Sequence, residues 1–430
     1  MTTCLLLMLI CFAGCTQISG CSGSQKPSNK ILLWHWMTDR NDTFQALAQQ
    51  YQKETGIEVD VQLFAPSEQY SQKIIASAQA SILPDIYGVL DKKSVVADFI
   101  NAGLVADLSD AMGADHAQWK NSLFDKALAD KQFDAGNTYG VKPGIYGVPI
   151  DVTNQQMLYN KKLLAKAGIT APPQTWADLI KDIQALKRVG ITPFVSGWGE
   201  LWLLDCFASN YAFNILGEGK IFATYRGEVK YTDPDWIKVF DLFAELRDKG
   251  ALMEGIVTKG NKYAEQDFAL ERAAFAFNGA WSVNVYYKMN PNLDYGVIPP
   301  PPVNFAHPLK IWGSAGSSFM VNSTSPNKDK AIAFLKWLTA KDQQSVLARE
   351  TKNLPSNKEA LAVVSPILAE FAKGMDQSTH PNIWPLNEDP SVSEAFDKGI
   401  QDIIIGQKTP QQVANYVQEV KDRQMAKGKH

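Results

Sequence analysis

A chain of 430 residues is long enough for two or three domains, and its 45 acidic and 42 basic side chains leave a net charge of −3. That balance excludes a strongly basic nucleic-acid surface and polybasic membrane docking, while a hydrophobic content of 45% excludes a disordered chain. Four of the five cysteines precede residue 22, so the body, which keeps Cys206, is expected to hold no internal disulfide and no cysteine-based metal site.

The chain opens with an apolar run, residues 4–13, that leads to two cysteines preceded by small residues. The run is shorter than the roughly 20 residues of a membrane span and has the length of a signal-peptide core. The small residues before Cys15 resemble the lipobox of bacterial lipoproteins, in which the cysteine becomes the lipid-bearing first residue. Cys21 is the alternative. We expect a signal peptide and lipobox over 1–21, a flexible linker over 22–30, and a lipid anchor such as palmitate.

Beyond residue 30, strands and helices alternate. The pattern of apolar residues predicts, in chain order, a strand over 31–36, a helix over 43–55, a strand over 57–63, a helix over about 67–81 and a strand over 84–87. Such alternation is typical of βαβ units with a largely parallel sheet, so the fold class is α/β.

Two segments rich in Gly and Pro interrupt this pattern, 139–149 and 298–303, and we expect the chain to cross between domains at each. Further helices are predicted over 163–167, 175–189, 201–216, 234–249 and 325–338.

Motifs for catalysis and cofactor binding are missing. There is no phosphate loop, no G-x-G-x-x-G, no H-E-x-x-H and no G-x-S-x-G, and the five histidines are scattered without ligand spacing. Ser325 to Lys328 matches S-x-x-K, but Pro326 and the amphipathic helix behind it indicate a helix start. We therefore expect no catalytic residue, no metal, no cofactor and no enzymatic activity.

Four stretches carry a specific resemblance. They are residues 157–168 with 171–179, residues 273–281, residues 313–321 with 325–338, and residues 34–36 with 54–59. In this order and spacing they are similar to the extracellular solute-binding proteins, family 1, of ABC importers, the group that contains maltose-binding protein.

This resemblance implies a two-lobed, hinge-connected fold of the periplasmic-binding-protein type (type II). One lobe would comprise 31–147 plus 300–340, and the other 148–299 plus 341–430. The lobes would close on a sugar or oligosaccharide and deliver it to membrane permease subunits. The protein would be a monomer anchored at the outer face of the cell membrane, or in the periplasm of a Gram-negative cell, with no nucleic-acid partner.

A sugar site needs flat aromatic faces for C–H groups and several hydrogen-bonding side chains for hydroxyls. By similarity Trp281 is a stacking platform, Trp202 resembles the family's second-lobe aromatic, and Trp384 lies near another. Gly279 lacks a side chain, so ligand could approach its backbone, and Trp312 could line the cleft floor. We expect Trp34 and Trp36 to be packing residues.

Polar candidates lie mainly in the first lobe. Thr38, Asp39 and Asn41 occupy the loop after the first strand, which the family uses to hold sugar hydroxyls. Asp91 follows the third strand, where the family often has a hydroxyl-binding acid, and Asp151 follows the first crossing at the cleft edge.

Two other functions remain open. An exported carbohydrate-active hydrolase would use the same aromatic-rich cleft with two carboxylates at a defined separation. The same fold could instead bind a polyamine, a metal complex or a phosphodiester.

Overall fold

A computed structural model describes residues 29–90, 93–378 and 388–427. Up to residue 160 the elements are β1 (Lys30–His35), α1 (Asn41–Thr55), β2 (Glu58–Leu63), α2 (Ser67–Gln79), β3 (Ile86–Tyr87), α3 (Lys93–Asn101), α4 (Ser109–Ser122), α5 (Asp125–Leu128), β4 (Gln132–Phe133), β5 (Gly144–Ile145) and β6 (Val148–Asn160). The later elements are α6 (Lys161–Lys166), α7 (Trp176–Arg188), β7 (Phe194–Val195), α8 (Leu201–Tyr225), α9 (Pro234–Asp248), α10 (Asn261–Ala269), β8 (Phe275–Gly279), α11 (Ser282–Met289), β9 (Tyr295–Ile298), β10 (Gly313–Val321), α12 (Lys328–Leu338), α13 (Lys341–Thr351), β11 (Leu354–Pro355), η1 (Lys358–Val363), α14 (Pro366–Lys373), η2 (Gly374–Gln377), α15 (Pro390–Ile404) and α16 (Pro410–Lys427).

Local sequence explains the predicted helices. In α1 the side chains of Phe44, Leu47 and Tyr51 form one buried stripe, and Gly56 ends the helix with a left-handed backbone, φ 75°. At the start of α7, Thr175 and Asp178 cap each other's backbone N–H groups.

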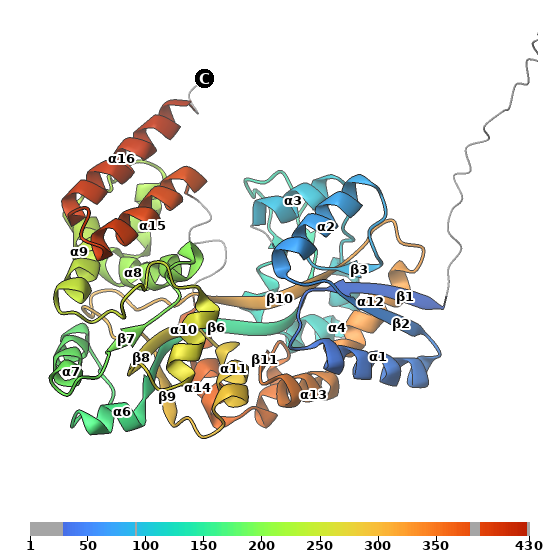
Figure 1. Ribbon diagram of the computed structural model, residues 1–430. Helices are drawn as coiled ribbons and strands as arrows, with labels where there is room; N and C mark the ends of the chain where they lie inside the picture. Colours follow the sequence, from blue (N-terminus) through green and yellow to red (C-terminus); the bar gives the residue numbers. More distant parts are fainter. Residues whose placement is uncertain (1–28, 91–92, 379–387, 428–430) are drawn as a thin grey trace, which may run out of the picture.

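The fold is α/β, with two lobes that share one sheet. Among the described residues the strand order is β2-β1-β3-β10-β6-β8-β7, with β9 and β11 also paired to β6. The long strands β6 and β10 pair antiparallel and run side by side from one group of helices to the other (Figure 1). We call the part built around β1, β2 and β3 the first lobe, and the part built around β7, β8 and β9 the second lobe.

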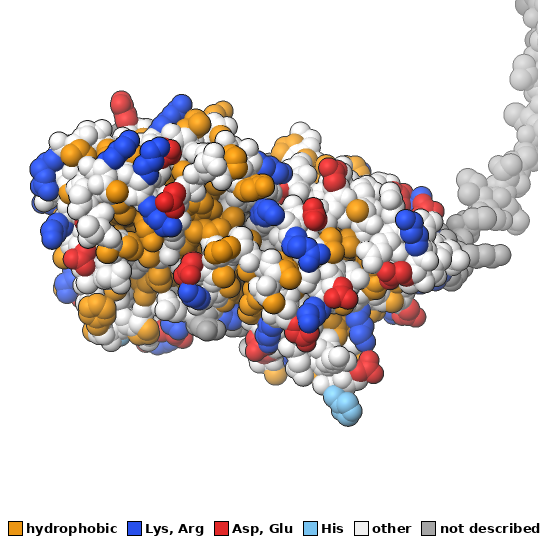
Figure 2. Space-filling view, turned by 90° about the horizontal axis from the view of Figure 1, so that it is seen from below, with side chains coloured by type: hydrophobic (Ala, Val, Ile, Leu, Met, Phe, Trp, Pro, Cys, Tyr) orange, Lys and Arg blue, Asp and Glu red, His pale blue; other side chains and the backbone are white. Residues whose placement is uncertain are grey.

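Each lobe has its own core. In the first lobe Leu33, Phe44 and Phe319 pack in one cluster, and in the second lobe Phe207 and Phe277 lie in another. On the face shown in Figure 2, acidic and basic side chains are interspersed over both lobes. None of the described helices is both long and apolar enough for a membrane crossing.

The second chain crossing differs from the sequence prediction. The Pro-rich run 298–303 stays on the second lobe, where the Pro302 carbonyl accepts a hydrogen bond from the Trp176 N–H at 2.9 Å. Prolines have no N–H for a strand ladder, so the crossing is made later, by β10.

A second difference concerns α13, which we expected in the second lobe. Leu347 of this helix is buried in the first-lobe cluster, together with Phe44 of α1 and Leu335 of α12. Its buried face therefore belongs with the first lobe.

Candidate functional site

A cavity of about 670 Å³ lies between the lobes, and we call it the large chamber. Its walls come from both lobes and from β10. The aromatic, charged and hydroxyl side chains that line this cavity are Trp36, Lys93, Asp130, Lys131, Trp202, Asp205, Trp312, Ser317, Glu394 and Asp397.

A second cavity of about 260 Å³, the small chamber, adjoins the first. It is lined by the predicted residues Thr38, Asp39 and Trp281, together with Arg40, Lys262 and Asn284. Trp36, Gly316 and Ser317 line both chambers, so the two cavities are neighbours in one cleft.

Two indole rings of the second lobe form a continuous aromatic wall. The centroids of Trp202 and Trp281 are 5.8 Å apart, with 52° between the ring planes. The Trp202 Nε1–H donates to Glu200 at 2.8 Å, and the Trp281 Nε1–H donates to Glu265 at 3.2 Å. Each ring is thus held by a carboxylate, while the Trp202 side chain stays 45% exposed.

Gly279 has a different role from the one predicted. A Cβ at this position would lie 2.0 Å from Cζ3 of Trp281, so the indole itself covers the glycine backbone. The glycine makes room for the Trp281 ring. That ring lies over the glycine backbone, where we had expected a ligand to approach.

A Gly279→Ala variant should therefore displace the Trp281 ring and lower solute affinity by at least about tenfold, while the fold persists. Gly219→Ala on α8 is the matched control, because a Cβ there meets nothing within 4 Å. Calorimetric titration of both variants checks this, and equal affinities would refute the role of Gly279.

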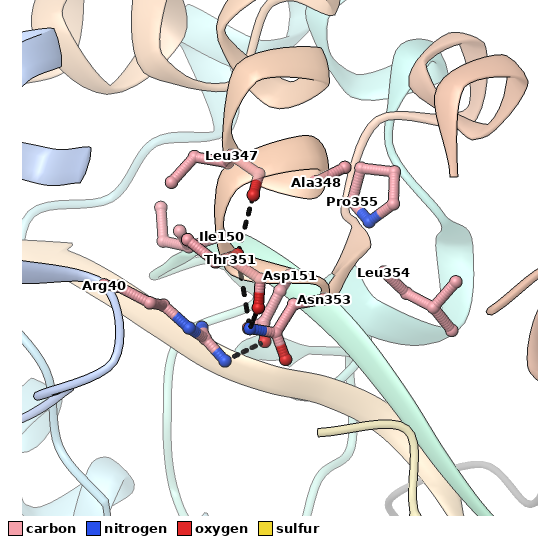
Figure 3. Close-up of a pocket in the computed structure, with 9 residues that line it drawn as sticks. All are labelled: Arg40, Ile150, Asp151, Leu347, Ala348, Thr351, Asn353, Leu354 and Pro355. Carbon is pink, nitrogen blue, oxygen red and sulfur yellow. Dashed lines mark hydrogen bonds and ion pairs between the residues drawn. The ribbon is translucent and has the colours of Figure 1, made fainter. Parts of the chain in front are cut away.

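Beneath the small chamber, Arg40 joins the loop after β1 to both crossing strands. Its Nη2 lies 2.7 Å from Oδ2 of Asp151 in β6, and its Nη1 donates to Oγ of Ser317 in β10 at 3.0 Å. Ser317 in turn donates to Asp151 at 2.5 Å. Arg40 and Asp151 are both buried, and Figure 3 shows them facing each other.

Asp39 shares this network. Its carboxylate lies 3.5 Å from Nε of Arg40 and accepts a hydrogen bond from Asn353 at 3.3 Å. Burial works to raise the pKa of Asp39, but the Arg40 guanidinium and Asn353 outweigh it, and the pKa lies below its ordinary value. Asp39 is thus an ionised acceptor at the chamber wall, whereas the carboxylate of Asp151 is committed to Arg40.

The cations of the large chamber are engaged as well. Lys93 donates to the carbonyls of Ala129 and Gln132 at 2.9 and 2.7 Å, and burial lowers its pKa to about 8. Lys131 lies 2.5 Å from the carboxylate of Asp130. These side chains form a fixed polar wall.

Asn41 does not line either chamber. Its side-chain amide donates a hydrogen bond to Oδ1 of Asp42 at 3.3 Å. The nearby His35 is buried, and its Nδ1 accepts a hydrogen bond from the Met37 N–H at 3.3 Å. Burial lowers the pKa of His35 to about 4, with Asn41 acting in the opposite direction.

His35 makes the stability of the protein depend on pH. In the unfolded chain His35 binds a proton as the pH falls below about 6.5, whereas in the folded chain it does so only near pH 4. The contribution of His35 to the free energy of unfolding should therefore fall by about 2 kcal/mol between pH 7.5 and 5, measured as the difference between the wild type and a His35→Asn variant. Urea titrations at both values check this, and a His35→Asn variant that keeps the full decrease would contradict it.

Several predicted residues meet at the cleft, and others cannot be placed. Trp202 and Trp312 line the large chamber, and Thr38, Asp39 and Trp281 line the small one. Asp91, Trp384, Cys15 and Cys21 lie outside the described residues. No group of His, Cys, Asp or Glu suited to a metal ion occurs within the described ranges.

Sequence reasoning missed Trp36, Arg40, Lys93 and Lys131. Trp36 was expected to be a packing residue. It does pack on Tyr70, with the ring centroids 5.0 Å apart, but it also lines both chambers. Its place at the end of β1, beside the polar loop 37–40, is a signal that could have identified it. The three cations gave no local signal.

Comparison with known proteins identifies the family. The family model described as bacterial extracellular solute-binding protein matches residues 35–345. The melibiose/raffinose/stachyose-binding protein of Bacillus subtilis is 24% identical over 82% of this chain and 79% of its own. A structure reported for xylan utilization by Caldanaerobius polysaccharolyticus covers 91% of this chain and 99% of its own at 20% identity, with a TM-score of 0.75.

A further structure, a solute-binding protein in complex with raffinose, covers 91% of this chain and 99% of its own at 16% identity, with a TM-score of 0.72. These structures share the fold of two lobes around a cleft, and the family model spans both lobes of this chain. The chain therefore belongs to the family of bacterial extracellular solute-binding proteins.

Proposed function

We propose that this protein is the solute receptor of an ABC importer and captures a neutral sugar or oligosaccharide between its lobes. The observation that carries the proposal is the set of four indoles, Trp36, Trp202, Trp281 and Trp312, around the two chambers. Indole faces match the apolar C–H faces of sugar rings, and the ionised Asp39 beside Thr38 can accept hydrogen bonds from hydroxyls.

The paired charges of the cleft favour a neutral solute over a phosphodiester. Each cation that lines the chambers already has a partner: Arg40 has Asp151, Lys131 has Asp130, Lys262 has Glu265 at 2.9 Å, and Lys93 has two carbonyls. A phosphate would have to displace these contacts. The names of the Bacillus relative and of the raffinose complex support a saccharide.

We further propose that solute binding closes the cleft. A solute held by both lobes binds the closed form better than the open form, and this difference in affinity draws the lobes together. The lobes would be 31–147 with 313–351 and 148–312 with 352–430. This division follows the expected one, except that residues 300–312 are assigned to the second lobe and α13 to the first. The closed form would then dock on the permease, and the solute would leave unaltered.

The location of the protein is part of the proposal. A lipid on Cys15, or alternatively on Cys21, would hold a monomeric receptor at the outer face of the membrane. Mass spectrometry of the mature N-terminus tests this, because an unmodified cysteine in an uncleaved chain would overturn it.

A thermal-shift screen tests the main proposal, since a bound solute raises the melting temperature by mass action. The panel contains mono- and oligosaccharides, spermidine as a polyamine and glycerophosphocholine as a phosphodiester. We expect stabilisation by saccharides alone. Stabilisation only by spermidine or glycerophosphocholine would overturn the saccharide assignment, and saccharide cleavage products would establish a hydrolase instead.

A further inference from the structure

We infer that the solute is an oligosaccharide of about three rings that fills both chambers, and that a monosaccharide is not the intended cargo. The inference rests on the proposed function and names the size class of its ligand. It is carried by the division of the cleft into two connected cavities, each with its own aromatic and polar lining.

The sizes of the chambers set the scale. Liquid water occupies about 30 Å³ a molecule, so the 260 Å³ of the small chamber correspond to about nine waters. One hexose ring, with about a dozen non-hydrogen atoms, has a similar size. By the same measure the 670 Å³ of the large chamber, before the lobes close, correspond to about 22 waters, which is room for at most two rings.

Each chamber can bind a ring independently. The large chamber offers Trp202 and Trp312, and the small chamber offers Trp281 with Thr38, Asp39 and Asn284. Because the rings of Trp202 and Trp281 are in contact, the aromatic wall continues from one chamber to the other. Trp36 lines both chambers on the opposite side.

Gly316 of β10 lies where the two chambers meet, since it lines both of them. The pairing of β10 with β6 is irregular here, with register shifts between Ala315, Ser317 and Ser318. Gly316 is exposed and lines both chambers, and a Cβ on it would lie 2.8 Å from Oδ2 of Asp151. Glycine at this position makes room for the Asp151 carboxylate, and its exposed backbone is part of the lining that the two chambers share.

Calorimetric titration with two saccharide ladders tests the inference. One runs from galactose through melibiose and raffinose to stachyose, and the other from xylose to xylotetraose. In the ladder that binds, we expect affinity to rise at least about tenfold from one ring to three and then to level off. A monosaccharide that binds as tightly as the trisaccharide would overturn the inference and leave the proposed function intact.

Two variants separate the chambers. Trp281→Ala should lower the affinity for the trisaccharide at least about tenfold and change the affinity for the shortest ligand less than about twofold. Trp202→Ala should lower the affinity for both. Tyr263→Ala is the control, because this exposed aromatic of the second lobe lines neither chamber. If Trp281→Ala weakened every ligand by the same factor, the two-chamber inference would be wrong. If neither these ladders nor any saccharide of the thermal-shift panel bound to the wild type, the proposed function would fail, and this inference with it.

Discussion

Replacing Asp151 by Leu is expected to lower the free energy of unfolding by about 3–5 kcal/mol. The cause is the Arg40 guanidinium, which is buried and would lose its closest anionic partner, at 2.7 Å, while Asp39 at 3.5 Å remains. Ser317 would lose its acceptor as well. Urea denaturation followed by circular dichroism measures the change.

A double-mutant cycle separates the cost of an unpaired charge from the loss of one contact. Arg40→Met should also be strongly destabilising, but Arg40→Met with Asp151→Leu should cost much less than the two single changes together, because no charge stays buried alone. Glu394→Ala with Lys398→Ala is the control, since solvent screens this exposed pair and its loss should change stability little. Additive losses at Arg40 and Asp151 would contradict the coupling.

The combined Trp202→Ala and Trp281→Ala variant is expected to lose at least about 100-fold in affinity for the best saccharide, or about 2.7 kcal/mol. The two rings form one wall, and their N–H groups are fixed by Glu200 and Glu265 before any ligand arrives. Rings held in place in advance lose little entropy on binding, so their removal costs most of the stacking energy.

Stability should change little in this double variant, because Trp202 is half exposed and Trp281 is only partly buried. Calorimetric titration measures the affinity, and the urea midpoint checks the fold. An unchanged affinity in a folded double variant would remove the aromatic wall from the proposed site.

Much of the fold could be predicted from local patterns. The stripe of Phe44, Leu47 and Tyr51 predicted α1, and the capping pair Thr175 and Asp178 lies at the start of the predicted helix α7. The crossing strand β10 was missed because its sequence, Gly-Ser-Ala-Gly-Ser-Ser, has no alternation of apolar and polar residues. It becomes a strand by pairing with β6, a contact between distant parts of the chain.

The candidate site was predicted in part, for a similar reason. Trp281 and Trp202 could be proposed because aromatics in polar, Gly-rich segments have little to pack against locally. Arg40 could not, since its burial depends on Asp151 and Ser317, which are far away in the sequence. The effect of Gly279 was missed because only the folded backbone shows that the Trp281 ring lies over it.

Small-angle X-ray scattering with and without the tightest-binding saccharide tests most directly the claim that the two lobes close on a sugar. At a ligand concentration that saturates the wild type, the radius of gyration of the wild type should decrease. At the same concentration it should stay constant for the Trp202→Ala and Trp281→Ala double variant. Superimposable curves for the free wild type and for the wild type shown by calorimetry to be saturated would contradict this account.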